Sequence, residues 1–64
     1  MRTVTSKKIH TGRYKVIDKK TKEHLGFVEQ CYYTKLWYVQ DVDGNGHDYA
    51  DTKWEAMRFF EYAE

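Results

Sequence analysis

A single helix signal near the C-terminal end constrains this chain more than any other feature of its sequence. Thr52 and Glu55 form a capping box, in which the Thr52 hydroxyl accepts a hydrogen bond from a free backbone N–H and the Glu55 side chain reaches back to the Thr52 N–H. Apolar residues follow at helical spacing, namely Ala56, Met57, Phe59, Phe60 and Ala63. We therefore expect one helix over residues 53–63.

The segments before this helix alternate in the manner of strands and are rich in aromatic and β-branched residues. We expect strands at approximately residues 13–18, 25–33, 36–41 and 47–50. The DGNG stretch before the last strand supplies the glycine and asparagine that tolerate the positive φ of a hairpin turn. The expected fold is α+β: a three- to four-stranded antiparallel sheet with the C-terminal helix packed on one face.

The N-terminal segment and the length of the chain bound the architecture further. Residues 1–11 combine β-branched and basic side chains, which predicts either an edge strand or a basic arm, and the sequence leaves both alternatives open. No proline, repeat or low-complexity segment marks an internal boundary, so we expect a single domain over residues 1–64. Eleven aromatic residues supply the core area that so short a chain needs. A core of this size does not enclose a deep catalytic cavity, so we expect no enzyme, no catalytic residue and no cofactor.

Cysteine usage and hydropathy predict the compartment. The one cysteine, Cys31, excludes an internal disulfide and suits a reducing environment. No apolar run is long enough to cross a bilayer, and the N-terminal residues lack the apolar stretch of a signal peptide. We therefore expect a cytoplasmic protein with no membrane partner.

The side chains that face the helix depend on the connection between the second and third expected strands. A three-residue connection places Phe27 and Trp37 under the helix and leaves Tyr32 and Tyr38 on the opposite face. A connection that differs by one residue exchanges the faces of one strand, because side chains alternate with a period of two. We favour the three-residue connection, and in either register aromatic residues remain on the face away from the helix.

Charge is distributed unevenly along the chain. Residues 1–25 hold eight Lys or Arg and two acids, a net +6, whereas residues 26–64 hold three and eight, a net −5, and the sum is the overall +1. A basic half of this kind suits a phosphate-bearing partner. The alternative is that the two halves lie side by side and partly cancel.

Basic and aromatic residues together form the candidate site for a nucleic acid or a protein partner. Clustered lysines provide the charge density that phosphates require. Outward tyrosines stack on single-stranded bases or anchor a protein partner. The alternative is that the tyrosines cover a second small core beneath the N-terminal segment. The candidate residues are Arg13, Lys15, Lys19, Lys20, Lys22, Tyr32 and Tyr38.

The stretch from Asp41 to Thr52 resembles a calcium loop at its beginning only. Asp41, Asp43 and Asn45 stand where an EF-hand loop has oxygen ligands, but Thr52 replaces the bidentate glutamate at the twelfth position, and the preceding residues are strand-like. We interpret the stretch as a hairpin, with Asp41, Asp43 and Asn45 as a weak calcium candidate. The histidines and the cysteine lack the spacing of zinc ligands, so we expect no other metal site.

The C-terminal part of the chain resembles a known family of small domains. The resemblance is carried by Trp37-x-Val39, Asp43-Gly44, and Thr52-Lys53-x-Glu55-Ala56 leading to Phe59 and Phe60. These motifs are similar to the end of the small arm-site-binding domains of phage and transposon tyrosine recombinases. That resemblance implies a three-stranded sheet with a helix, and a sheet that enters the DNA major groove. The family's strand after the turn is usually basic, whereas GHDYAD here is acidic and would repel phosphate.

Two functions follow from these observations. The first is a small non-catalytic nucleic-acid-binding module of phage or mobile-element origin. The alternative is a protein-binding adaptor or inhibitor that uses an exposed aromatic sheet face, and the same face would also permit self-association.

Overall fold

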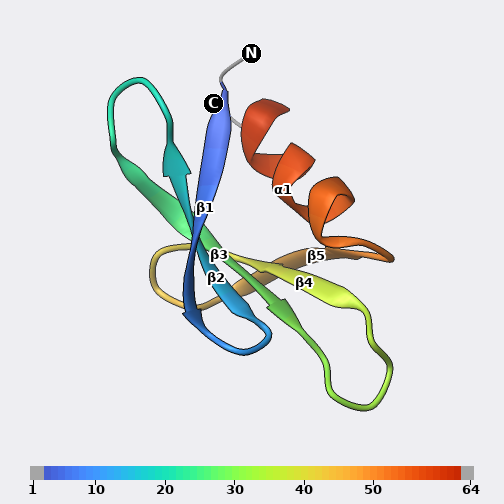
Figure 1. Ribbon diagram of the computed structural model, residues 1–64. Helices are drawn as coiled ribbons and strands as arrows, with labels where there is room; N and C mark the ends of the chain where they lie inside the picture. Colours follow the sequence, from blue (N-terminus) through green and yellow to red (C-terminus); the bar gives the residue numbers. More distant parts are fainter. Residues whose placement is uncertain (1–2, 63–64) are drawn as a thin grey trace.

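The computed structural model describes residues 3–62 and shows a five-stranded antiparallel sheet with one helix across one side (Figure 1). The strands follow one another as a meander, in the order β1-β2-β3-β4-β5. The elements are β1 Val4–His10, β2 Arg13–Asp18, β3 His24–Gln30, β4 Trp37–Gln40, β5 Gly46–Ala50 and α1 Lys53–Tyr62. The sheet curls enough that β1, the strand farthest from β5 in the order, also contacts α1. The expected α+β class is therefore confirmed.

The sheet has one strand more than the upper limit we expected. The additional strand is β1, so the edge-strand alternative for the N-terminal segment is confirmed over Val4–His10, and residues 1–2 lie outside the described residues. Strand β1 pairs with β2 through a tight turn in which Gly12 has a φ of 82°. Glycine adopts this left-handed conformation without steric cost, which permits the short connection.

The core lies between the sheet and α1. Val16, Val28 and Val39 are fully buried, one on each of the three central strands. The helix covers these valines with Ala56, Met57 and Phe60. The helical spacing seen in the sequence thus corresponds to a buried stripe, and burial of these side chains contributes most of the stabilisation available to so small a domain.

The register between β3 and β4 differs from the one we favoured. Residues 31–36 connect the two strands, so Gln30 pairs with Trp37 and Val28 pairs with Val39. Trp37 lies on the helix side, as expected, but it shares that side with Val28, and Phe27 lies on the opposite face of the sheet. The prediction that Phe27 packs under the helix is wrong.

The expected second strand is too long at its C-terminal end, which explains the difference in register. The chain leaves the sheet at Cys31, whose N–H donates to the Leu36 carbonyl oxygen at 2.8 Å, while the Lys35 N–H returns to the Cys31 carbonyl oxygen at 2.9 Å. Lys35 has a φ of 65°, in the left-handed region that tight turns use. A six-residue connection replaces the three-residue one, and the odd difference of three residues exchanges the faces of one strand.

No helix among residues 3–62 is both long and apolar enough to cross a membrane.

Candidate functional site

All five strands contribute side chains to the sheet face opposite α1, which we call the open face. The strand pairing identifies its members, because two residues directly opposite each other on neighbouring strands point to the same side of the sheet. The principal members are Lys7 on β1, Arg13 and Lys15 on β2, Phe27 and Glu29 on β3, Tyr38 and Gln40 on β4, and Tyr49 on β5. The open face thus combines basic, aromatic and amide side chains with the carboxylate of Glu29.

Tyr38 and Tyr49, the tyrosine pair, form the aromatic part of the open face that solvent reaches most easily. They are cross-strand partners, and their ring centroids lie 6.1 Å apart with the planes tilted by 53°. The exposed fraction is 36% for Tyr38 and 62% for Tyr49. The phenol rings are therefore available to a ligand instead of being sealed in a second core.

Arg13 is the centre of a hydrogen-bonded group, the arginine cluster, which also contains Glu29, Gln40 and Phe27. Arg13 Nη1 donates to Glu29 Oε1 at 3.2 Å and to Gln40 Oε1 at 3.0 Å. Gln40 Nε2 donates to the same Glu29 oxygen at 3.3 Å. The guanidinium carbon lies 4.2 Å from the centroid of the Phe27 ring. Three strands thus hold one guanidinium in a defined place.

Lys7 and Lys15, the lysine pair, face each other across β1 and β2. Like charges directly opposite in an antiparallel pair are destabilising. Among the described residues, the ion pairs engage Arg13 and His47 but neither of these lysines. An anion bound beside them would relieve their repulsion, so this corner of the open face suits a phosphate.

The one acidic residue of β5, Asp48, does not face the lysine pair. Asp48 pairs with the buried Val39, which places its carboxylate on the helix side, whereas the neighbouring Tyr49 points to the open face. The sequence led us to expect that the acidic GHDYAD strand would repel phosphate. The alternation of the strand removes this objection for the open face, because the carboxylate and the tyrosine lie on opposite sides.

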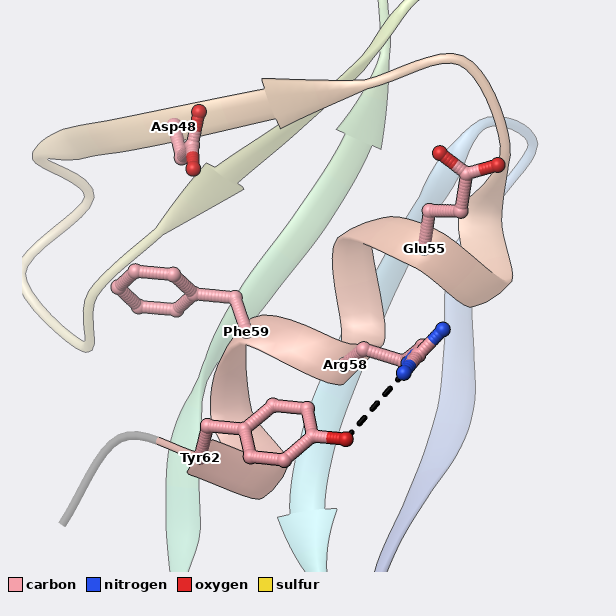
Figure 2. Close-up of a pocket in the computed structure, with 5 residues that line it drawn as sticks. All are labelled: Asp48, Glu55, Arg58, Phe59 and Tyr62. Carbon is pink, nitrogen blue, oxygen red and sulfur yellow. Dashed lines mark hydrogen bonds between the residues drawn. The ribbon is translucent and has the colours of Figure 1, made fainter.

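Asp48 instead lines a shallow hollow on the helix side, together with a second acidic residue, Glu55 (Figure 2). The hollow is lined by Asp48, Glu55, Arg58, Phe59 and Tyr62, and the figure shows Asp48 on β5 while the other four project from α1. Arg58 Nη2 donates to the Tyr62 hydroxyl at 3.2 Å, and this contact raises the pKa of the guanidinium. With two carboxylates and one guanidinium, the hollow carries a net negative charge and does not suit a phosphate.

The structure brings together only part of the site predicted from the sequence. Arg13, Lys15 and Tyr38 lie on the open face in neighbouring strands. Tyr32 does not join them: it lies in the connection after β3, is 78% exposed, and contacts Tyr33 and the Lys35 ammonium group. The expectation that Tyr32 and Tyr38 share a sheet face is therefore wrong, because the chain has already left the sheet at residue 31.

The three turn lysines, Lys19, Lys20 and Lys22, lie in the β2–β3 connection. Six residues of extended chain separate Lys19 from Arg13, so the turn lysines begin roughly 20 Å from Arg13 along the strand. The carboxylate of Asp18 shapes this turn, since its Oδ1 accepts hydrogen bonds from the N–H groups of Lys20 and Thr21 at 2.8 and 3.0 Å. The turn is thus a second basic region at the far end of the hairpin.

The sequence analysis missed Phe27, Glu29 and Tyr49 as members of the open face. The face of Tyr49 could have been predicted, because strand alternation within HDYA places Tyr49 and Asp48 on opposite faces. The face of Phe27 and Glu29 could not, since it depends on the length of the connection that follows their strand.

Asp41 organises the β4–β5 hairpin through its carboxylate. Its Oδ1 accepts hydrogen bonds from the N–H groups of Asp43 at 2.9 Å and Asn45 at 3.0 Å, and its Oδ2 lies 2.9 Å from His47 Nε2. The hydrogen bond with His47 is the largest cause of a lowered pKa at Asp41. The hairpin interpretation of this stretch is confirmed by the β4–β5 pairing. Within residues 3–62, no group of three or more His, Cys, Asp or Glu side chains is placed to hold a metal ion.

Comparisons of this chain with protein-family models, with curated proteins and with solved structures found no match. The resemblance to recombinase arm-site-binding domains therefore stays a prediction.

Proposed function

We propose that this chain is a small non-catalytic nucleic-acid-binding module that takes a single-stranded segment across its open face. The observation that carries the proposal is the placement of the tyrosine pair and the lysine pair on one face of one sheet. Open sheet faces that bind single strands combine aromatic stacking platforms with basic side chains along the path of the backbone.

The tyrosine pair and the lysine pair would contact different parts of the nucleic acid. Bases would stack on Tyr38 and Tyr49, which are accessible on β4 and β5. Phosphates would lie over Lys7 and Lys15 on β1 and β2. Neighbouring strands are about 4.8 Å apart, so the path from β2 to β5 spans roughly 14 Å and accommodates a few nucleotides. The turn lysines, Lys19, Lys20 and Lys22, would extend the positive field and speed encounter.

A second candidate function is a protein-binding adaptor, and a separate observation favours it. Tyr32 and Tyr33 form an edge-to-face pair with ring centroids 5.4 Å apart, at an exposed loop outside the open face. Paired exposed tyrosines are typical anchors of protein interfaces. This site would bind without the lysine pair, so its affinity would depend little on salt.

Fluorescence anisotropy with labelled single-stranded DNA and RNA of about 12 nucleotides tests the first proposal. We expect binding at low salt that weakens steeply towards physiological salt, because phosphate contacts release counterions. Lys7→Ala should lower affinity and reduce the salt slope by roughly 0.7, the value for one phosphate contact on a single strand.

Lys8→Ala is the matched control. Lys8 is the next residue on the same strand but pairs with Tyr14, which packs against the core on the helix side. This variant removes the same charge from the other face and should leave the salt slope nearly unchanged. Absence of binding at low salt, or equal effects of the two variants, would contradict the proposal.

A further inference from the structure

The Arg13 guanidinium presents an unused hydrogen-bonding edge on the open face. A guanidinium carries five N–H donors. The two on Nη1 point to Glu29 and Gln40, at 3.2 and 3.0 Å. In the described part of the chain, no hydrogen bond engages Nε or Nη2. These two nitrogens form the parallel fork that binds a pair of adjacent acceptors.

The surrounding residues hold this fork in one orientation. Phe27 lies beneath the guanidinium, with 4.2 Å between the ring centroid and the guanidinium carbon, and the Glu29–Gln40 hydrogen bond ties the two acceptors together. Only 23% of the Arg13 side chain is exposed. A side chain held in this way loses little rotamer freedom when it binds, so the fork is preorganised.

The charge of the arginine cluster favours a neutral ligand over a phosphate. Glu29 balances Arg13 within the cluster, and 39% of its side chain is exposed, so its carboxylate would repel an incoming phosphate. Phosphate has a better place at Lys7 and Lys15, which have no acidic partner in residues 3–62. Tyr38 is the cross-strand partner of Glu29 and supplies an adjacent ring on which a base can stack.

We propose that Arg13 selects guanine, by donating two hydrogen bonds from Nε and Nη2 to the O6 and N7 atoms of a base carried on the open face. Guanine presents two adjacent acceptors on this edge, whereas adenine presents an acceptor beside an amino donor. The inference rests on the proposed nucleic-acid function and adds a base preference to it. Glu29, Gln40 and Phe27 act as positioning residues for the guanidinium.

The test uses the full chain and a labelled strand of about 12 thymidines that carries one central purine. The purine is guanine, inosine, 7-deazaguanine or adenine. Inosine keeps both acceptors and should bind like guanine. 7-Deazaguanine lacks N7 and adenine lacks O6, and each should bind more weakly by roughly 5- to 100-fold, the range of one bidentate base contact.

Arg13→Lys keeps the positive charge and removes the fork, so it should abolish the preference for guanine while changing affinity for the thymidine-only strand little. Arg58→Lys is the matched control, because Arg58 lies on α1 at the helix-side hollow. It should retain the full preference. Thermal unfolding of both variants should give a cooperative transition like that of the parent, which makes the binding comparison valid.

The outcomes separate this inference from the function on which it rests. Equal, salt-dependent binding of all four purine strands would overturn the guanine preference and leave nucleic-acid binding intact. A uniform loss of affinity of Arg13→Lys for all strands, with the guanine preference retained or never present, would identify Arg13 as a phosphate contact and would also overturn the inference that Arg13 selects guanine. Failure of every strand to bind at low salt would remove both proposals.

Discussion

At the residue scale, Gly26 is the point where sheet and helix approach most closely. A Cβ atom built at this position would clash with the Gln40 carbonyl oxygen and would lie 2.7 Å from Phe60 Cε1. Phe60 is one of the buried helix residues, so it cannot move away without opening the core. The glycine therefore allows α1 to lie directly on the sheet.

Gly26→Ala should destabilise the protein by roughly 1–3 kcal/mol, the cost of adding a methyl group to a packed core. Urea unfolding followed by tryptophan fluorescence measures this loss. Gly46→Ala is the control, since a Cβ there meets nothing within 4 Å, and it should change the free energy of unfolding little. Equal stability of the two variants would show that the close approach at Gly26 is not a constraint.

Asp41 predicts a specific dependence of stability on pH. Its hydrogen bonds with His47 and with the backbone of Asn45 and Asp43 lower its pKa from the ordinary value of 3.8. A carboxyl whose pKa is lowered by folding stabilises the protein above its unfolded-state pKa, and this contribution is lost as pH falls through the folded-state pKa. Asp41→Asn should therefore be less stable than the parent at neutral pH, with the difference shrinking below pH 3.8. Thermal unfolding of both proteins across this range tests the point, and a difference independent of pH would refute it.

At the element scale, the start of α1 is determined by Thr52. The Glu55 N–H donates to Thr52 Oγ1 at 3.2 Å, and the Ala56 N–H donates to the Thr52 carbonyl oxygen at 3.1 Å. Lys53 then places its ammonium group 3.7 Å from the centroid of the Tyr14 ring on β2. A local cap and one tertiary contact thus fix where the helix begins.

Thr52→Ala should lower the free energy of unfolding by about 1 kcal/mol, the usual loss when a helix cap is removed. Thr52→Ser keeps the hydroxyl and should retain most of the stability. Chemical denaturation of the three proteins provides the measurement. If the serine variant is as unstable as the alanine variant, the hydroxyl does not act as a cap.

At the scale of the whole molecule, the two sides of the sheet differ in chemistry. The open face carries the lysine pair, the arginine cluster and the tyrosine pair, and the helix side carries the core and the acidic hollow. The uneven charge along the sequence thus becomes, in part, a difference between the two sides of the sheet. Asp48 and Tyr49 illustrate this, because they are adjacent in the sequence but point to opposite faces.

Tyr49→Ala should weaken single-strand binding by roughly 5- to 100-fold, because a stacked base contributes 1–3 kcal/mol. Its ring is exposed, so the change should barely affect the unfolding temperature. Trp54→Ala is the matched control, since Trp54 is a 71% exposed aromatic residue on α1. Anisotropy titrations of both variants decide the matter: an equal loss in the two would place binding outside the open face.

Local patterns in the sequence were sufficient to predict several elements of the fold. Strand β2 spans the expected residues 13–18, and α1 begins at the expected Lys53, with Ala63 outside the described residues. The β4–β5 hairpin also forms where DGNG predicts it. These elements depend on interactions between residues only a few positions apart, such as the Thr52 cap, and such interactions can be read from the sequence.

The composition of the open face was decided by the tertiary structure. Phe27, Glu29 and Tyr49 join Arg13 and Tyr38 only through pairing between strands that are distant in the sequence. Because side chains alternate with a period of two, the length of one connection determines which residues each face receives. The sequence by itself determined where the helix and most strands lie; the six-residue turn at residues 31–36 determined which side chains meet.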